Sequence, residues 1–300
     1  MYRLLLISLL LFINSAKLYC QSSNMSLPAI QQQIQHELNS IPGTFALAFI
    51  NPDNPKQQLL INAKEVFHAA STMKTPVMIE VYRQSSQGKF SLQDSILVKN
   101  EFKSIVDGSL YSMNIKDDSG EGLYKMIGKT MTIEALVYDM ITYSSNLATN
   151  ILIDKVGAKN VMITMKALGA NDIQVLRGVE DSKAYQQGLN NTTTAYDLML
   201  IFQKMALHQL VNAEVDQAMI NVLLEQKFNE IIPAALPKSV KVAHKTGSIT
   251  GVQHDTGIVY LPDGRKYVLV LLSKNLQDSK QGIAILSKVS GIIYRYMIQK

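Results

Sequence analysis

Patterns typical of β-strands occur near both ends of the chain, and a long run of helical patterns separates them. Apolar runs around a turn-rich segment predict a β-hairpin near the start, with strands at residues 43–51 and 57–62. Near the end, further strands are predicted at residues 240–247, 254–262 and 266–274. This order limits the chain to an α/β fold, more narrowly α+β. We expect one antiparallel sheet, built from both termini and flanked by helices, with an inserted all-helical subdomain.

The helical patterns lie between these strands and at the two ends of the chain. A period of about 3.6 residues and capping signals predict helices from Ser26 and at residues 71–83, 132–140, 145–156, 158–168, 194–207, 214–226 and 279–299. The stretch 86–129 is rich in turn residues and predicts no regular element. We expect an α/β subdomain made of residues 24–66 and 227–300, and a helical subdomain at residues 67–226.

The first residues have the pattern of a bacterial export signal. Arg3 precedes an apolar run, Leu4 to Ile13, which is shorter than the roughly 20 residues that cross a bilayer. We therefore expect residues 1–20 to be a signal peptide, no membrane span, and a periplasmic or secreted protein. Cys20 is the only cysteine, so we expect no internal disulfide; a lipid anchor at Cys20 stays open.

Composition argues against several kinds of partner. The formal net charge of +5 is spread over 300 residues without basic runs, so nucleic-acid binding has no support. His244 and the pair His254-Asp255 invite a metal interpretation, but no third ligand stands at a usual spacing. We expect neither metal nor cofactor, and we expect a monomer.

Three short motifs follow one another in suitable contexts. They are Ser71-Thr72-Met73-Lys74, Ser144-Ser145-Asn146 and Lys245-Thr246-Gly247. A serine and a lysine three residues apart share one face of a helix, where an amine can take the proton of a hydroxyl. The same spacing recurs at Ser86 and Lys89, beside a helix-ending Gly88. The later motifs select Ser71 and Lys74, and we interpret the second copy as coincidence.

The motifs resemble the signature of class A β-lactamases and penicillin-binding proteins, which is Ser-x-x-Lys, Ser-Asp-Asn and Lys-Thr-Gly. The same resemblance extends to "FHAASTMK", "LNNTTTAYDL" and "IIPAALPKSVKVAHKTGSITG". It covers roughly residues 34–294 and implies the serine β-lactamase/DD-peptidase fold, in agreement with the order of strands and helices. The implied substrate is a small β-lactam or a peptidoglycan-like peptide.

Within the first two motifs, the resemblance implies a catalytic role for three residues and a substrate-binding role for a fourth. Ser71 is the nucleophile, with its hydroxyl at a helix N-terminus. Lys74 takes the serine proton, with a pKa lowered by Lys245 and by partial burial. Ser144 passes a proton to the leaving nitrogen, and Asn146 binds the amide side chain of the substrate.

Further residues are implied to bind the substrate. Lys245 and Thr246 meet its carboxylate, and Gly247 lets the strand approach closely. The backbone N–H groups of Ser248 and of the nucleophile Ser71 form the oxyanion hole. No arginine is clearly placed for the carboxylate, so we expect His254 either to pack or to contact that group.

Two parts of the chain depart from the family pattern. Ser145 stands where the family commonly has aspartate, and we expect a local loss of hydrogen bonding without loss of chemistry. Glu180 is the candidate base for deacylation, but Ala184 replaces an asparagine that helps to hold the water. Asn191 replaces an aspartate that pins this loop to its arginine, and Asp181 is a neighbour that can compete with Glu180.

These features leave three functions open. The first is a β-lactamase that deacylates through a water activated by Glu180. The second is a penicillin-binding DD-peptidase, or a related peptide or ester hydrolase, whose lactam acyl-enzyme is long-lived. The third is a catalytically dead ligand-binding domain, against which the intact Ser71, Lys74, Ser144 and Lys245 argue.

Overall fold

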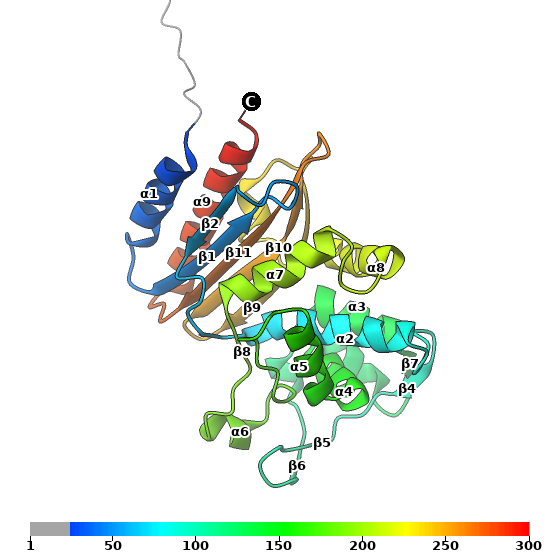
Figure 1. Cartoon of the computed structure of the whole chain (residues 1–300). Helices are drawn as coiled ribbons and strands as arrows, with labels where there is room; N and C mark the ends of the chain where they lie inside the picture. The colour runs from blue at the N-terminus through cyan, green and yellow to red at the C-terminus, as the bar shows by residue number, and fades with distance from the viewer. Residues whose placement is uncertain (1–24, 300) are drawn as a thin grey trace, which may run out of the picture.

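A five-stranded antiparallel sheet forms the centre of the fold (Figure 1). The structure is a computed structural model and describes residues 25–299. The strands, in spatial order, are β2 (Gln58–Ile61), β1 (Thr44–Ile50), β11 (Lys266–Lys274), β10 (Val252–Tyr260) and β9 (Lys241–Ile249). β1 pairs with β11 along its whole length, from Thr44 opposite Lys274 to Ile50 opposite Val268. The expected sheet, built from both ends of the chain, is confirmed.

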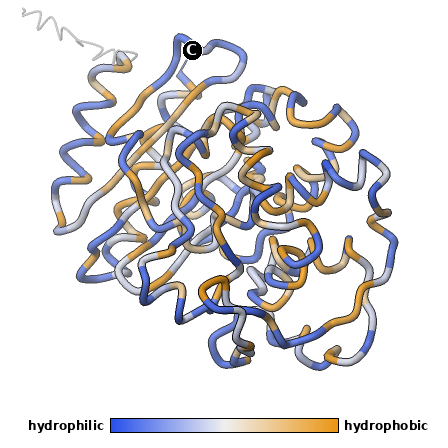
Figure 2. Tube along the Cα trace, turned by 60° about the horizontal axis from the view of Figure 1, so that its bottom comes forward, coloured by the Kyte–Doolittle hydropathy of each residue, from blue (hydrophilic) through white to orange (hydrophobic). Residues whose placement is uncertain are grey.

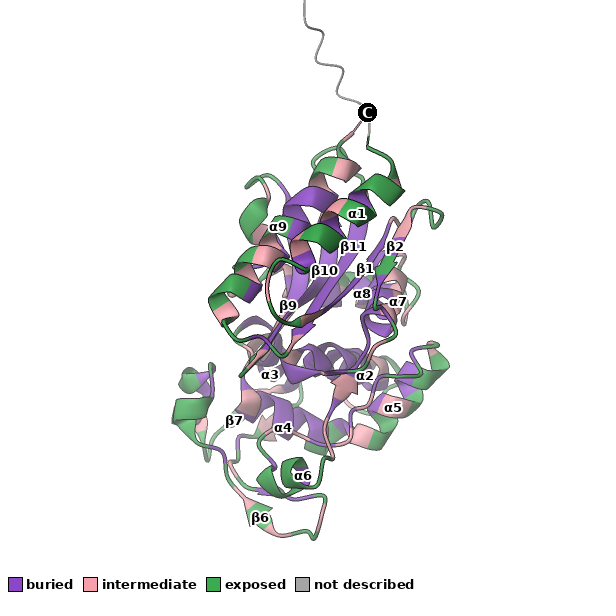
Figure 3. Ribbon diagram, turned by 90° about the vertical axis from the view of Figure 1, so that its left-hand side faces the viewer, coloured by how far each residue is buried: buried purple, intermediate pink, exposed green. Residues whose placement is uncertain are grey.

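Helices cover both faces of this sheet and build a second layer beside it. α1 and α9 lie side by side on one face, and α7 lies on the other (Figures 1 and 3). The helices are α1 (Leu27–Leu38), α2 (Lys74–Ser86), α3 (Ile133–Thr142), α4 (Asn146–Val156), α5 (Ala158–Ala167), α6 (Ser182–Gln186), α7 (Ala195–Ala206), α8 (Ala213–Leu224) and α9 (Ser279–Met297). Most predicted helix ends agree with these bounds within two or three residues.

Both faces of the sheet are buried at β1 and β11, which explains why the sequences of these two strands are apolar almost without interruption. Alternate residues of β1 point to opposite faces. Leu47 and Phe49 join the core under α1 and α9, whereas Ala46 and Ala48 join the core shared with the helical layer. Figure 2 shows that hydrophobic segments run through the interior and that most hydrophilic ones lie at the outside.

α2 is the central helix of the helical layer, buried on nearly every side (Figure 3). It begins at Lys74, later than the predicted start at Ser71. The preceding residues form a 3₁₀ turn, η1 (Ala70–Met73), because Ala70 has a φ of 45° and cannot continue a helix backwards. This turn lies against β9 and β10 and thereby joins the helical layer to the sheet.

The stretch 86–129 contains only short elements, as its turn-rich sequence indicates. Together with the other short segments they are β3 (Phe67–His68), β4 (Ser95–Leu97), β5 (Phe102–Lys103), β6 (Leu110–Tyr111), η2 (Ile115–Asp117), η3 (Glu121–Met126), β7 (Thr130–Thr132), β8 (Thr192–Thr193) and η4 (Pro233–Ala235). Within residues 25–299, none of the helices combines the length and apolarity needed to cross a bilayer. The expected signal peptide at residues 1–20 and the anchor at Cys20 lie outside the described residues, and the subdomain boundaries stay predictions.

The alternation along β2 makes a prediction about stability. Leu59 is 2% exposed and Leu60 is 37% exposed, although they are neighbours. We expect Leu59→Ala to lower the free energy of unfolding by about 3 kcal/mol, and Leu60→Ala by less than about 1 kcal/mol. Urea unfolding of the two variants measures this difference. Equal losses would contradict the register of β2 on β1.

Candidate active site

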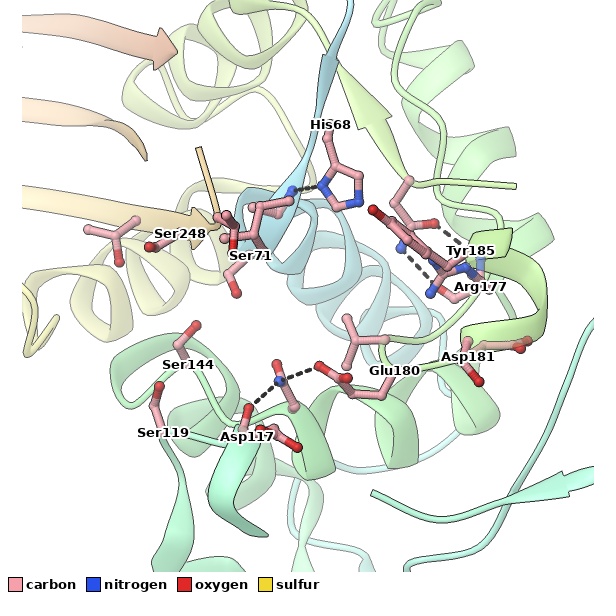
Figure 4. A pocket seen from close by; sticks show the side chains of 18 of the residues that line it. His68, Ser71, Asp117, Ser119, Ser144, Arg177, Glu180, Asp181, Tyr185 and Ser248 are labelled. Atoms are coloured by element: carbon pink, nitrogen blue, oxygen red, sulfur yellow. Dashed lines mark hydrogen bonds between the residues drawn. The ribbon is translucent and has the colours of Figure 1, made fainter. Parts of the chain in front are cut away.

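A pocket of about 560 Å³ opens beside the edge strand β9 (Figure 4). Side chains from the η1 turn, the turn before α4, the loop 177–191 and β9 line it. The predicted site residues on its wall are Ser71, Ser144, Asn146, Glu180, Thr246 and Ser248. The remaining three, Lys74, Lys245 and Gly247, are buried next to these residues. One pocket therefore brings together residues from all three motifs.

The η1 turn holds Ser71 on the pocket wall. Ala70, directly before it, has a φ of 45°, in the left-handed region that costs an alanine about 1 kcal/mol or more. The backbone N–H of Ala70 donates to Nδ1 of His68 at 3.0 Å, and Oγ1 of Thr72 donates to the carbonyl of Ala69 at 2.6 Å. These bonds fix the peptide that carries the N–H of Ser71.

Strand β9 runs directly against this turn. A Cβ on Gly247 would lie 3.2 Å from Ala70 Cβ, from the backbone nitrogen of Ser71 and from Thr72 Cγ2. A larger residue at 247 would therefore push the strand or the turn aside. β9 is an edge strand, so one side of its backbone has no partner strand in the sheet. An oxyanion hole from the N–H groups of Ser71 and Ser248 fits this arrangement and stays a prediction.

The two lysines converge on the hydroxyl of Ser144. Nζ of Lys74 donates to the carbonyl of Ser144 at 2.6 Å, to its Oγ at 3.2 Å and to Oδ1 of Asn146 at 2.8 Å. Nζ of Lys245 donates to the same Oγ at 3.0 Å and to the carbonyl of Thr246 at 2.9 Å. Both lysine side chains are 0% exposed. The hydroxyl of Ser144 thus lies between two buried amines.

Burial controls the protonation of both amines. It lowers the pKa of Lys74 to about 7, against the negative charges of Asp118 and Glu180, which raise that pKa. Burial, and then the charge of Lys74, hold the pKa of Lys245 well below its usual range. At neutral pH an amine with a pKa of about 7 is deprotonated in about half of the molecules, and in that form it can accept a proton.

Strained backbone conformations are concentrated at this pocket. Among the described residues, six non-glycine residues have a positive φ, and three of them are Ala70, Ser144 and Glu180. Such conformations cost on the order of 1–3 kcal/mol and persist where the surrounding contacts enforce them. The fold therefore maintains the geometry of this site against local cost.

Asn146 connects the amines to the carboxylate of Glu180. Its Nδ2 donates to Oε1 of Glu180 at 3.3 Å and to the carbonyl of Asp117 at 3.3 Å. Glu180 points into the pocket (Figure 4). Burial and then the charge of Asp117 raise the pKa of Glu180, whereas the charge of Lys74 lowers it. A partly buried carboxylate at this place can take a proton from a water in the pocket.

The loop that carries Glu180 is held mainly by bonds to neutral groups. Oδ1 of Asn191 accepts from the backbone N–H groups of Leu176 (2.9 Å) and Arg177 (3.3 Å), and its Nδ2 donates to the carbonyl of Arg177 at 3.0 Å. The guanidinium of Arg177 donates to the carbonyl of Leu189 at 2.9 Å. Asparagine at 191 thus pins the loop through its backbone, without an ion pair to the arginine.

The carboxylate of Asp181 is held by hydrogen bonds of its own and does not take the place of Glu180. Its carboxylate accepts from Oγ of Ser104 at 2.9 Å, from the N–H of Ile105 at 3.0 Å and from the N–H of Ala184 at 3.1 Å. It caps α6 and ties this loop to the segment before β6. The methyl group of Ala184 is buried and offers no polar atom to a water.

Comparison with known proteins agrees with this arrangement. A sequence model of the β-lactamase enzyme family matches residues 29–297. The chain belongs to this family. It is similar to the extended-spectrum β-lactamase PER-1 of Pseudomonas aeruginosa, with 25% identity over 91% of this chain and 89% of that protein.

Two solved structures with the same fold are also similar to this chain. A β-lactamase from Sphaerobacter thermophilus has a TM-score of 0.78 and 26% identity, covering 92% of this chain and 100% of that one. The structure of PBP-A has a TM-score of 0.76 and 25% identity, covering 90% of this chain and 96% of that one. The family and the fold that the three motifs imply are therefore confirmed.

The structure adds residues that the motifs do not reveal. Asn150 lies one helical turn after Asn146 on α4, and its side chain bonds to both the N–H (2.7 Å) and the carbonyl (3.0 Å) of Val179, just before Glu180. A buried asparagine in an apolar helix is the signal that points to it. The expected loss of hydrogen bonding at Ser145 is wrong, because Asp118 supplies a carboxylate to the same turn.

The histidines near the site are structural. His254 is 0% exposed; its Nε2 donates to the carbonyl of His68 at 2.9 Å and its Nδ1 accepts from the N–H of Ser273 at 3.2 Å. Burial lowers the pKa of His254 to about 4, so the ring is neutral and packs, rather than meeting a carboxylate. Nδ1 of His244 bonds to Asp255 at 2.8 Å. Residues 25–299 contain no group of three or more histidine, cysteine or acidic side chains arranged for a metal ion.

The contact of Gly247 with the η1 turn makes a prediction about activity. We expect Gly247→Ala to slow acylation of Ser71 about 10- to 100-fold, because the added methyl displaces the turn from the strand. Stopped-flow acylation by a penicillin measures the rate. Gly122→Ala is the control, since a Cβ at Gly122 meets nothing within 4 Å. An unchanged rate in Gly247→Ala would contradict the close approach.

Proposed function

We propose that this protein is an exported serine β-lactamase that hydrolyses β-lactams through an acyl-enzyme on Ser71. The observation that carries the proposal is the pair of buried lysines that share the hydroxyl of Ser144 in the pocket that Ser71 also lines. A binding protein gains nothing from keeping two desolvated amines at one hydroxyl. Membership of the β-lactamase family supports the same reaction.

Acylation is assigned to Ser71, Lys74 and Ser144. The neutral amine of Lys74 takes the proton of Ser71 while the serine oxygen attacks the lactam carbonyl carbon. The ring C–N bond then breaks, and Ser144 gives its proton to the leaving nitrogen. The hydroxyl of Ser144 regains a proton from Lys74, which lies 3.2 Å from it. The N–H groups of Ser71 and Ser248 stabilise the charge on the carbonyl oxygen.

Substrate binding uses the strand and the turn before α4. Lys245 and Thr246 attract the substrate carboxylate, with Ser248 beside them on β9. The side chain of Gln253 donates to Oγ of Ser248 at 2.9 Å and holds that hydroxyl in place. Asn146, which lines the same pocket, binds the amide of the substrate.

Deacylation is assigned to Glu180. Its carboxylate takes a proton from a water while the water oxygen attacks the ester carbon. The ester C–O bond then breaks, and this proton returns to the oxygen of Ser71. Asn146 and Asn150 hold this carboxylate and its backbone in place. Nothing in this proposal needs a metal or another cofactor.

A DD-peptidase, or a related peptide or ester hydrolase, is the second candidate. Ala184 supports it, because the side chain four residues after Glu180 has no polar group to hold a water. The similarity to the structure of PBP-A supports the same candidate. In that case the lactam acyl-enzyme is long-lived and the natural substrate is a peptidoglycan-like peptide. In both cases the pattern of residues 1–20 supports export to the periplasm or outside the cell, and we propose a monomer.

The choice of Ser71 over the second Ser-x-x-Lys copy is tested by a matched pair of variants. We expect Ser71→Ala to lower nitrocefin turnover at least about 10³-fold, because it removes the oxygen that attacks the lactam carbonyl carbon. Ser86→Ala is the control; Ser86 is exposed and bonds only to its own helix, so turnover stays within about 2-fold. Turnover that survives in Ser71→Ala would contradict the proposal.

The pKa of Lys74 predicts how acylation depends on pH. The base is the neutral amine, so the rate rises with pH up to about 7 and levels off above it. Below that value we expect about a tenfold loss per pH unit. Single-turnover acylation by a penicillin, followed by acid quench and mass spectrometry, measures the profile. A rate that is constant from about pH 5.5 to 8 would exclude Lys74 as the base.

A further inference from the structure

One carboxylate outside the three motifs holds the turn that carries two site residues. Asp118 is 5% exposed and lies between η2 and η3. Its two oxygens accept hydrogen bonds from the N–H groups of Gly120 (2.8 Å), Asn146 (2.9 Å) and Leu147 (2.8 Å) and from the hydroxyls of Tyr124 (3.1 Å) and Ser145 (3.5 Å). A single buried side chain thus collects donors from two segments that are remote in sequence.

These bonds complete the N-terminus of α4. The first backbone N–H groups of a helix have no partner within the helix. In α4 those of Asn146 and Leu147 go to Asp118, and that of Ala148 goes to Oγ of Ser145 at 3.2 Å. A negative charge at this end also interacts favourably with the helix dipole. Asp118 is therefore a cap supplied by a distant loop, in addition to the cap that Ser145 provides.

The capped turn is the one on which both lysines converge. Ser144 has a φ of 58° and holds this strained conformation between Lys74 and Lys245 on one side and the start of α4 on the other. The loop with Asp118 packs directly on the turn, since a Cβ on Gly120 would overlap the side chain of Ser145. Any shift of this loop moves the start of α4, and with it the hydroxyl of Ser144.

We propose that Asp118 is the positioning residue that sets Ser144 and Asn146 for acylation of Ser71 and balances the positive charge that Lys74 gains in that step. This inference rests on the function proposed above. When Lys74 takes the serine proton, an ammonium ion forms in a fully buried place, and a fixed carboxylate nearby favours that form. The charged groups that act on Lys74 are Asp118, Glu180 and Lys245.

Asp118→Asn tests the proposal, because it keeps the shape and removes both the charge and half of the acceptor sites. We expect acylation by a penicillin to slow about 100-fold. We also expect the acidic limb of its pH profile to move to lower pH, since the charge that raises the pKa of Lys74 is gone. If Asp118 acted only as a helix cap, the acidic limb of the pH profile would stay where it is in the wild type.

Asp216→Asn is the matched control. Asp216 is also buried, at 0% exposure, and accepts hydrogen bonds from the N–H groups of Leu210 (2.8 Å) and Val211 (3.0 Å), but it does not line the pocket. This variant is expected to lose thermal stability to a similar extent, yet to keep the acylation rate within about 2-fold and the limb in place.

A glycine pair tests the same claim with the carboxylate intact, should Asp118→Asn fail to fold. Gly120→Ala places a methyl group against Ser145 and is expected to slow acylation about 10-fold, whereas Gly122→Ala has free space and is expected to change nothing. Wild-type rates and an unshifted limb in Asp118→Asn, or a wild-type rate in Gly120→Ala, would overturn the inference. A wild-type protein that forms no adduct would instead overturn the proposed function.

Discussion

Two lysine amines that are buried from solvent and share one hydroxyl place the strictest demand on this structure. Lys74 comes from the central helix α2, Lys245 from the edge strand β9, and Ser144 from the turn before α4. Burying a charged amine costs several kcal/mol unless its partners are fixed. The three elements must therefore meet within hydrogen-bond distance, and the site exists only when the helical layer is docked on the sheet.

The fold brings these three elements together at a cost in strained backbone conformations. The η1 turn brings the helical layer against β9, and Gly247 removes the side chain that would keep them apart. Ala70, Ser144 and Glu180 all hold positive φ values around the same pocket. Bonds from His68, the two lysines, Asp118 and Asn150 enforce these conformations. Strain that persists next to buried polar groups is typical of a site kept for chemistry rather than for stability.

Much of this arrangement can be predicted from the sequence. The strand patterns at both ends of the chain predict the sheet because strand periodicity and turn signals are local. The three motifs select Ser71 over Ser86 because their order and context agree. The predicted start of α2 lies three residues early, since the strain at Ala70 depends on β9 and on His68, which no local pattern reveals.

The supporting residues escape prediction for a related reason. Asp118 stands in a turn-rich stretch and acts on α4 from 28 residues away in sequence, so nothing local distinguishes it from its neighbour Asp117. Asn191 differs from the expected aspartate, yet it holds the same loop through backbone bonds. In both cases a residue other than the one usual in the family makes the hydrogen bonds that hold the segment. The partners of such bonds depend on the folded structure and cannot be read from one sequence.

The lifetime of the acyl-enzyme tests the account most directly. The wild type and Glu180→Gln are mixed with a penicillin, quenched at intervals and digested, and the mass of the peptide that carries Ser71 is followed. The account predicts an adduct on Ser71 in both proteins, which the wild type clears within its turnover time and the variant retains at least about 100-fold longer. Equal persistence in the two proteins would remove Glu180 from the mechanism and favour the DD-peptidase alternative. No adduct in the wild type would contradict the account as a whole.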